Sequence, residues 1–295
     1  MLAYTLNKIS KVSYSPKSYN NKYGLPLSLL NHKINNDFGV FEVGMDKKGE
    51  IDYLTKILKP NIGVITNISY AHSKNFKNIS KIAEAKSEII DNIKSFGTVI
   101  LNADDKFYKY HKSKALRRKL KVLSFSLKNQ NSSIHLYKVK KINKKFQIFI
   151  RYNNLILIFN SRSDSVNFIQ NLICTLLVLS IFFDIKLLSK NIFFDFKIPE
   201  GRGDISKIKV NKKIINLVDE SYNSNPLSLK AALLNYDKLN VKKAKKHLLI
   251  GDMLELGKHS VKHHLLFKSL LNNLKVNKIH VIGKYIKKAI EGVNQ

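Results

Sequence analysis

Short apolar runs alternate along this chain with longer stretches whose apolar residues recur at helical spacing, and this alternation limits the possible folds more than any other feature. In the stretch 49–59, for example, Ile51, Leu54 and Leu58 share one face of a helix. Strands that alternate with helices favour an α/β fold, in which helices cover a mostly parallel sheet. The predicted strands are 38–43, 61–68, 97–102 and 121–127, a hairpin follows over 146–160, and the predicted helices are 49–59, 80–94 and 164–183.

A domain boundary is predicted where proline and glycine cluster, from Ile198 to Gly203. A fresh strand–helix pattern begins after this cluster, with predicted strands at 214–218, 247–250 and 278–282. We therefore predict a parallel-sheet central domain at 1–198 and a partial Rossmann-like domain at 199–295.

The chain is strongly basic, with 52 lysines and arginines against 21 aspartates and glutamates and a formal net charge of +31. The lysines are spread along the chain, and an AT-rich coding sequence would enrich lysine, asparagine and isoleucine everywhere at once in this way. Two interpretations stay open. We expect that the positive charge reflects drift in composition together with anionic small-molecule substrates, and that there is no nucleic-acid partner. The alternative is that the charge serves nucleic-acid binding.

Three features predict a soluble cytoplasmic protein without a membrane partner. Cys174 is the only cysteine, so no disulfide can form within the chain. The first ten residues lack the apolar core of a signal peptide. The most apolar stretch, 172–183, is too short to span a bilayer and is typical of a buried helix.

Three side chains could carry chemistry at one edge of the predicted sheet. Glu42 lies in the first predicted strand and His72 in the loop after the second, and the carboxyl ends of parallel strands form the ligand crevice of α/β proteins. Lys86 falls on the apolar face of its predicted helix, with Ile82 and Ile89. Each residue could also have no chemical role. Glu42 and His72 would then be solvated side chains, and the Lys86 amine would reach water at the end of its apolar stem. The functional alternative for Lys86 is an amine with a lowered pKa that takes up carbon dioxide and becomes a metal-binding carbamate.

Two polar stretches follow predicted strands. The stretch 102–105 reads Asn-Ala-Asp-Asp and suits either a turn or a contact with a base or ribose. The stretch 219–226 reads Asp-Glu-Ser-Tyr-Asn-Ser-Asn-Pro and joins an apolar run to a helical pattern over 227–239. Serine, asparagine and proline favour helix starts, so this loop is either a helix cap or part of a nucleotide site.

Nine segments of the chain occur in the same order as in the Mur ligase family, which the sequence resembles over nearly its whole length. Two of them, 219–226 and 251–257, favour the branch of the family that adds D-alanyl-D-alanine to a UDP-N-acetylmuramoyl tripeptide. The nine segments are 18–29, 42–45, 49–51, 66–72, 85–89, 102–105, 201–203, 219–226 and 251–257.

The resemblance implies an ATP-dependent amide ligase that uses Mg²⁺. ATP would phosphorylate the tripeptide carboxylate, and the amine of D-alanyl-D-alanine would displace the phosphate. Glu42, His72 and a carbamylated Lys86 would be the catalytic and metal-binding residues. The other implied roles are adenine contact by Asn102, ATP contact by Arg202, ribose contact by Asp219 or Glu220, framing of the nucleotide by Asn225, and binding of the muramoyl peptide by Asn20 and Asn21.

Two departures from the family limit what this chain would do alone. The P-loop-type central domain of the family opens with a Gly-Lys-Thr phosphate loop, whereas this sequence contains no such loop and starts inside the helix that follows it. The uridine-binding N-terminal domain and the final strands of the family are also missing, and Asn167 stands where relatives often have histidine. We therefore expect a monomeric internal piece of such a ligase, or the product of a broken gene, that is inactive by itself.

Two other functions compete with this interpretation. One is a different amide ligase of the same superfamily, of the folylpolyglutamate type, which should lack the Ser-Tyr-Asn-Ser-Asn-Pro pattern of 221–226. The other is a degenerate, non-catalytic basic protein that binds nucleic acid or a cell-wall partner.

Overall fold

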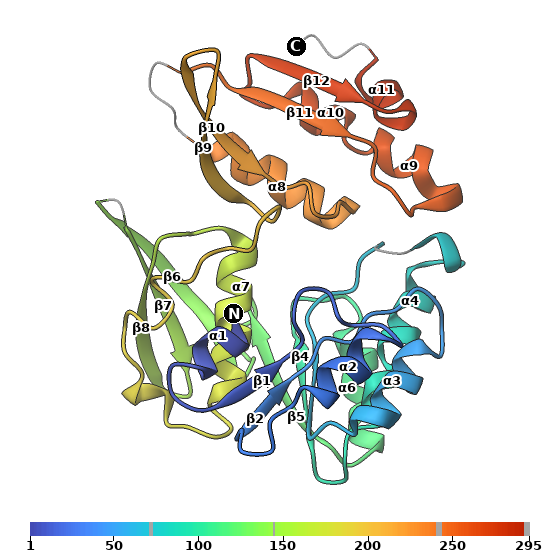
Figure 1. Cartoon of the computed structure of the whole chain (residues 1–295), viewed down its shortest axis with the longest axis vertical. Coiled ribbons are helices and arrows are strands. Elements are labelled where there is room, and N and C mark those ends of the chain that lie inside the picture. The colour runs from blue at the N-terminus through green and yellow to red at the C-terminus, as the bar shows by residue number, and fades with distance from the viewer. Residues whose placement is uncertain (71–72, 144, 240–243, 292–295) are drawn as a thin grey trace. The chain divides into compact units, whose positions relative to one another are not determined.

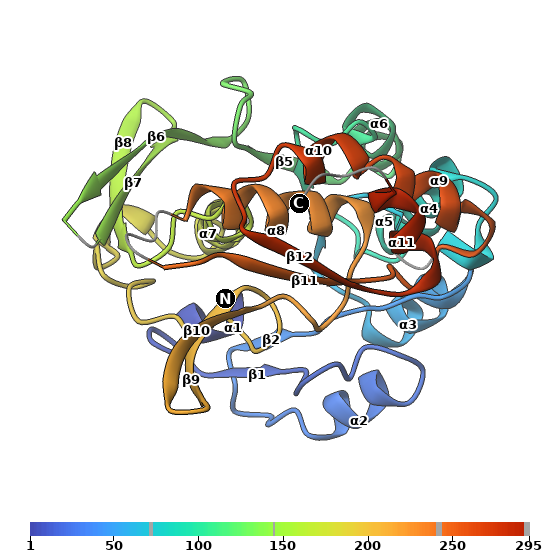
Figure 2. The same cartoon turned by 90° about the horizontal axis from the view of Figure 1, so that it is seen from above.

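The computed structural model describes residues 1–70, 73–143, 145–239 and 244–291, and the chain divides into two compact units (Figures 1 and 2). The first unit contains Met1–Ile68 and Ser80–Phe196, and the second contains Ser69–Ile79 and Lys197–Gln295. The division after Phe196 lies next to the boundary proposed from the sequence. The grouping of Ser69–Ile79 with the second unit was not anticipated.

A six-stranded sheet with the strand order β3-β4-β5-β6-β7-β8 forms the centre of the first unit. The pairs from β3 to β6 are parallel, and β6, β7 and β8 form an antiparallel meander. The predicted α/β class is confirmed, although β6 was not anticipated. The strands are β3 (Ile62–Ile65), β4 (Thr98–Asn102), β5 (Lys121–Ser126), β6 (Ile134–Ile142), β7 (Lys145–Tyr152) and β8 (Leu155–Ser161).

Helices cover both faces of this sheet. Every residue of β4 is buried, and because strand side chains alternate between faces, both faces of the strand must be covered. The helices α6 (Tyr108–Arg117) and α7 (Val166–Leu179) both pack against β4 and β5. Helix α7 is apolar almost throughout, and the Ser165 side chain caps its start by accepting from the Phe168 amide. The other helical elements are α1 (Leu2–Leu6), α2 (Gly24–Leu30), α3 (Glu50–Leu58), α4 (Ile79–Lys86), α5 (Glu88–Asp91) and η2 (Ile185–Leu187).

Two elements of the first unit differ from the sequence prediction. The strand expected at 38–43 is only β2 (Phe38–Val40), which pairs with β1 (Val12–Tyr14) and is at most half-buried. The helix expected at 80–94 is interrupted at Ser87, whose hydroxyl donates to the Glu84 carbonyl at 2.6 Å. A serine that bonds its own backbone in this way competes with regular helix bonds, which gives a local reason for the break.

In its described residues, the second unit combines a hairpin, a parallel strand pair and several helices. Its buried core lies between the strand pair and the helices, and it includes Leu233, Ile250, Phe267, Leu271 and Ile286. The parallel pair with helices agrees with the predicted Rossmann-like pattern. The elements are β9 (Asp204–Val210), β10 (Lys213–Asp219), α8 (Pro226–Lys238), β11 (His247–Gly251), η3 (Gly257–His259), α9 (Ser260–Leu265), α10 (Lys268–Asn272), β12 (Lys278–Ile282) and α11 (Lys284–Ile290).

The segment Ser69–Ile79 packs within the second unit although it follows β3 in sequence. Tyr70 contacts the core of that unit, and its ring centroid lies 4.2 Å from that of His263. The backbone amide of Lys74, in η1 (Ser73–Asn75), donates to the Glu255 carbonyl at 2.8 Å. These contacts make the segment a structural part of the second unit.

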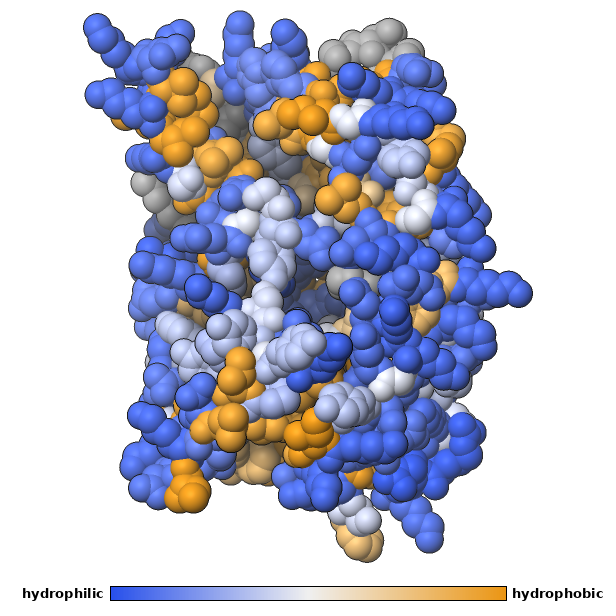
Figure 3. All heavy atoms as spheres, turned by 45° about the vertical axis from the view of Figure 1, so that its right-hand side comes forward, coloured by the Kyte–Doolittle hydropathy of each residue, from blue (hydrophilic) through white to orange (hydrophobic). Residues whose placement is uncertain are grey.

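Within the described parts of the chain, no helix is both long and apolar enough to cross a membrane. The face of the molecule drawn in Figure 3 is mostly hydrophilic, with hydrophobic residues in separate patches.

Candidate functional site

Lys86 ends α4, and its amine donates to the backbone carbonyl of Asn67 at 3.0 Å. Burial of the amine lowers the pKa of Lys86, while the nearby carboxylates of Asp105 and Glu42 act in the opposite direction. A lowered pKa raises the fraction of neutral, nucleophilic amine at neutral pH. The structure therefore holds this amine at a backbone carbonyl, and the functional role of Lys86 remains a prediction.

The loop after β3 that receives Lys86 is held from two sides. Asn102, at the end of β4, is 5% exposed, and its side-chain amide donates to the Asn67 side chain at 3.0 Å. Gln170 on α7 donates to the same Asn67 oxygen at 2.9 Å. The Asp105 carboxylate accepts from the Ile68 amide at 2.8 Å. Asn102 therefore has a positioning role in this structure, and its predicted contact with adenine remains a prediction.

Glu42 is an exposed residue just beyond the carboxyl end of β2, and it contacts Asn20. The Asn20 side-chain amide donates to a Glu42 carboxylate oxygen at 3.0 Å, and the Asn20 carbonyl accepts from the Gly44 amide at 2.7 Å. A Cβ at Gly44 would lie 2.9 Å from the Asn20 side chain, so only glycine fits there without movement. Asn20 thus orients the carboxylate that the sequence singled out.

Asn21 and His72 are the remaining predicted residues of the first site. The Asn21 side chain accepts from the amides of Tyr23 and Gly24 at 3.0 and 2.9 Å, which fixes the turn that leads into α2. Its predicted contact with the muramoyl peptide is still untested. His72 lies outside the described residues.

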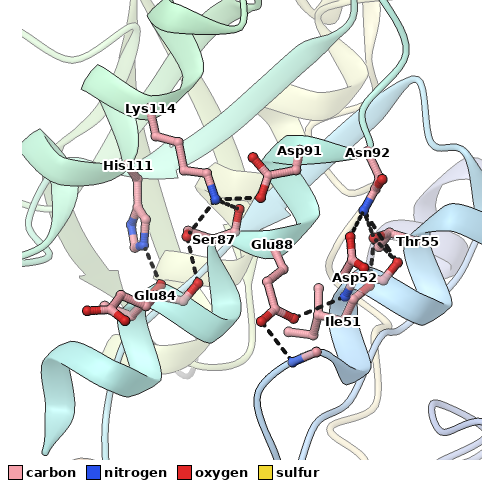
Figure 4. Close-up of polar contacts among 12 residues, drawn as sticks. Ile51, Asp52, Thr55, Glu84, Ser87, Glu88, Asp91, Asn92, His111 and Lys114 are labelled. Atoms are coloured by element: carbon pink, nitrogen blue, oxygen red, sulfur yellow. Dashed lines mark hydrogen bonds and ion pairs between the residues drawn. The ribbon is translucent and has the colours of Figure 1, made fainter.

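Glu88, which the sequence analysis missed, ties the segment after Lys86 to the loop after Glu42 (Figure 4). Glu88 is 8% exposed, and its carboxylate accepts from the backbone amides of Gly49 at 2.8 Å and Asp52 at 3.1 Å. These amides belong to the first turn of α3, where a negative charge is stabilising. A signal for this role was available, because Glu88 is a carboxylate within a largely apolar stretch two residues after Lys86.

Lys114 holds the break between α4 and α5 from the other side (Figure 4). Its amine donates to the carbonyl and hydroxyl oxygens of Ser87, both at 3.0 Å, and to the Asp91 carboxylate at 2.6 Å. Lys114 and Glu88 together fix the backbone that follows Lys86.

A second group of predicted residues meets around the turn 201–203 of the second unit. The Gly203 amide donates to the Asp219 carbonyl at 2.6 Å, and the guanidinium carbon of Arg202 lies 4.3 Å from the centroid of the Tyr222 ring. Gly203 has a φ of +92°, and a Cβ there would lie 2.9 Å from a Glu220 carboxylate oxygen. The turn therefore requires glycine and places Arg202 beside the 219–222 loop.

Three carboxylates gather at this turn. Partial burial raises the pKa of Glu220, and the neighbouring carboxylates of Asp204 and Asp219 raise it further. Hydrogen bonds from Ser221 lower the pKa of Asp219. In the described ranges, no group of three or more histidine, cysteine, aspartate or glutamate residues is arranged to hold a metal ion. Carboxylate oxygens accept hydrogen bonds, and the contact of Asp219 or Glu220 with a ribose remains a prediction.

Asn225 caps α8. Its side chain accepts from the amides of Leu227 at 3.0 Å and Ser228 at 3.1 Å, and the Ser228 hydroxyl completes a capping box. Pro226 occupies the first turn. The helix-cap alternative for this loop is therefore confirmed, and the contact of Asn225 with a nucleotide remains a prediction.

Comparison with known proteins gives a family match over the first part of the chain, where the Mur ligase middle domain matches residues 1–179. A UDP-N-acetylmuramoyl-tripeptide–D-alanyl-D-alanine ligase of Rickettsia prowazekii is 32% identical over 276 residues, which are 92% of this chain and 59% of that protein. The ligase of the same name from Buchnera aphidicola (subsp. Baizongia pistaciae) is 30% identical over 273 residues, which are 92% of this chain and 57% of that protein. The chain thus spans somewhat more than half the length of these relatives.

Solved structures show the same fold. MurF from Acinetobacter baumannii matches with a TM-score of 0.87 and 24% identity, over 99% of this chain and 62% of that one. MurF ligase from Thermotoga maritima, solved in complex with ADP, matches with a TM-score of 0.82 and 23% identity, over 95% of this chain and 62% of that one. An S73A mutant of L. casei FPGS matches less closely, with a TM-score of 0.61 and 12% identity over 98% of this chain and 85% of that one.

Proposed function

The chain belongs to the Mur ligase family, and from this premise we propose that it supplies the nucleotide-facing part of an ATP-dependent ligase of peptidoglycan synthesis. The ligase would join D-alanyl-D-alanine to UDP-N-acetylmuramoyl-tripeptide, as the names of its curated relatives state for those proteins. The chain spans 57 and 59% of these two relatives, so the proposal concerns the whole protein to which these residues belong.

In the proposed reaction, the terminal carboxylate of the tripeptide attacks the γ-phosphorus of ATP, and ADP leaves. The amine of D-alanyl-D-alanine then attacks the acyl phosphate carbonyl. Inorganic phosphate leaves with the bonding electron pair, the amine loses a proton, and an amide bond remains. Most of the catalysis in such phosphoryl transfers comes from positioning and from stabilising charge on the phosphate oxygens.

The observation that carries the proposal is the position of the Lys86 amine, which is held at the Asn67 carbonyl with the Glu42 and Asp105 carboxylates nearby. A free amine cannot bind Mg²⁺, but the lowered pKa of Lys86 favours the neutral form that adds carbon dioxide to become a carbamate. Carbamate and carboxylate oxygens are the ligand type that Mg²⁺ prefers, so Lys86 and Glu42 fit the ion. His72 is proposed as a third ligand from the sequence alone. The metal would neutralise charge on the phosphates when bound.

The second unit would contribute the nucleotide contacts. The structure with ADP among its relatives supports a nucleotide site in proteins of this fold. Arg202 would meet phosphate oxygens, and Asp219 or Glu220 would accept from ribose hydroxyls. Asn225 caps the start of α8, and it would help to shape the nucleotide site from that position.

We also propose a monomeric, cytoplasmic protein without nucleic-acid or membrane partners in the ligase reaction. ATP and the UDP-linked tripeptide are cytoplasmic substrates, and the single buried cysteine, Cys174, suits a reducing compartment. The strong positive charge favours substrates that carry several phosphate charges.

The alternative, a ligase of the folylpolyglutamate type, is supported only by a more distant fold match. The TM-score to the FPGS structure is 0.61, against 0.87 for the MurF structure. The Ser-Tyr-Asn-Ser-Asn-Pro loop of 221–226 also favours the D-alanyl-D-alanine branch.

The test begins with the native protein from its source cells. Its intact mass shows whether it exceeds the 33.9 kDa of this chain. Phosphate release is then measured with ATP, Mg²⁺, UDP-N-acetylmuramoyl-tripeptide and D-alanyl-D-alanine, and a parallel reaction offers a folate and glutamate. We expect phosphate release only with the muramoyl peptide pair. Release only with the folate pair would identify the alternative, and absence of ATP binding would contradict both ligase proposals.

A further inference from the structure

The part of the chain that contains β6, β7 and β8 has an extreme charge pattern. Residues 106–163 include 16 lysines and arginines and no aspartate or glutamate. Shorter stretches without acids occur at 1–36, 53–83 and 256–290 with five to eight lysines each, and the stretch 106–163 is longer and carries more bases than any of them. The positive charge of this stretch has no acidic residue of its own to balance it.

Two aromatic rings and three cations gather on one face of the β6–β7 pair, and we call these five residues the ring-and-cation face. The Lys138 amine lies 5.2 Å from the centroid of the Tyr137 ring and 5.0 Å from that of Phe149. Lys140 lies 5.7 Å from the Phe149 ring, and the Arg151 guanidinium lies 5.4 Å from the Tyr137 ring. Each ring is therefore flanked by two positive groups at cation–π distance.

A register irregularity produces this arrangement. Lys138 pairs with Phe149 across the strands, but the register shifts between Leu136 and Lys138, so Tyr137 is an extra residue in β6. Bulges of this kind re-aim a side chain and bend the strand. Tyr137 remains 49% exposed as a result.

The opposite face of the same strands supplies the core. Ile148 and Ile150 alternate with Phe149 along β7, and both are fully buried. Phe159 on β8 pairs with Ile148 and is 2% exposed. The fold is therefore stabilised by the inner face, and the ring-and-cation face is available for contact with another molecule.

We propose that the ring-and-cation face binds single-stranded nucleic acid. The lysines and the arginine would neutralise phosphates, and bases would stack on the rings, which is the combination that non-specific single-strand binding uses. An anionic bilayer fits less well, because Phe149 is half-buried in the sheet and cannot insert far into a membrane. This activity lies outside the proposed ligase reaction and shares no residue with the site described above.

The test is fluorescence anisotropy of a fluorescein-labelled 12-nucleotide oligouridine with the full chain, over a range of salt concentrations. We expect binding at physiological ionic strength that weakens steeply as salt rises. The double substitution Lys138→Gln and Lys140→Gln should make the slope of log K against log salt shallower by about 1.4, because each lost contact with a single strand contributes about 0.7. Tyr137→Ala should weaken binding on the order of ten-fold at fixed salt through lost stacking.

Two controls separate this site from general positive charge. Lys121→Gln with Lys141→Gln removes the same charge from the same sheet and should change binding less than two-fold. Heparin, a polyanion without bases, should bind the Tyr137→Ala variant as tightly as the parent chain. The proposal is overturned if oligouridine does not bind, if the control pair loses as much affinity as the Lys138 and Lys140 pair, or if Tyr137→Ala has no effect. Preferential binding to vesicles that contain phosphatidylserine would also overturn it.

Discussion

The Lys86 amine donates to the backbone carbonyl of Asn67 at 3.0 Å, and the Asn67 side chain is itself held by Asn102 and Gln170. Asn102 on β4 and Gln170 on α7 thus position the proposed catalytic lysine through Asn67, although both lie far from Lys86 in the sequence. A substitution that removes any of these contacts is expected to shift the Lys86 amine and thereby to slow catalysis.

Replacement of Lys86 by alanine is expected to abolish ligation in the complete native enzyme. The amine that would form the carbamate is then lost, and added bicarbonate should not restore turnover in a phosphate-release assay. Lys81→Ala is the matched control, because Lys81 lies on the same helix and pairs with Glu84 at the surface. Substantial turnover by the Lys86 variant would rule out its proposed role in metal binding.

Glu88→Gln is expected to lower the free energy of unfolding by about 1–3 kcal/mol, because a buried carboxylate that accepts two backbone bonds is replaced by a group that accepts less well. Unfolding in urea measures the change. Glu84→Gln serves as the control on the preceding turn, since Glu84 forms a surface pair with Lys81 and such pairs contribute about 0–1 kcal/mol. Equal effects of the two substitutions would contradict the special role assigned to Glu88.

Asn225→Ala should destabilise the protein by about 1 kcal/mol through loss of the α8 cap, whereas Asn225→Ser should retain most of that stability. Comparison of the two variants also distinguishes a capping role of Asn225 from a contact with the nucleotide. If Asn225 touches the nucleotide, the serine variant keeps the unfolding midpoint but binds ATP more weakly in a calorimetric titration. If ATP binding of the serine variant is unchanged, Asn225 is a helix cap only.

Glu220 is expected to make stability depend on pH. Its pKa is raised in the folded state above the usual glutamate value of about 4.3, so the folded protein holds this proton more tightly than the unfolded chain does. The associated stability is fully present below that usual value and is lost as pH rises through the folded-state pKa. Glu220→Gln should therefore gain stability relative to the parent as pH increases from 4 to 7. A stability difference that does not vary with pH over this range would refute the raised pKa.

The parallel part of the fold could be predicted from the sequence because its signals are local. The helix expected at 49–59 is α3 (Glu50–Leu58), and the strand expected at 97–102 is β4 (Thr98–Asn102). The single buried face of α3 gives apolar residues at helical spacing, and the burial of both faces of β4 gives a short continuous apolar run. The strands β6 and β9 were not predicted, because charged residues interrupt the apolar pattern of their sequences. Much of each strand is also exposed.

Several residues of the candidate site were proposed from the sequence, but the contacts that hold them were not. Glu42, Lys86 and Asn102 were found because they are polar residues at strand ends or on an apolar helix face. The partners that hold them were not found, since Gln170 reaches Asn67 across 103 residues and Glu88 reaches Gly49 across 39. Such pairings depend on the tertiary fold and leave no short-range pattern.

The packing of Ser69–Ile79 in the second unit has a consequence for biosynthesis. Tyr70 leaves the ribosome long before its partner His263, and at roughly 5–20 residues per second the interval is on the order of 10–40 s. During that time the first unit can form its sheet, whereas the Tyr70 ring still lacks the His263 ring that it contacts in the folded protein. Tyr70 is therefore open to a chaperone throughout this interval, and a pause in translation before residue 263 would lengthen that period directly.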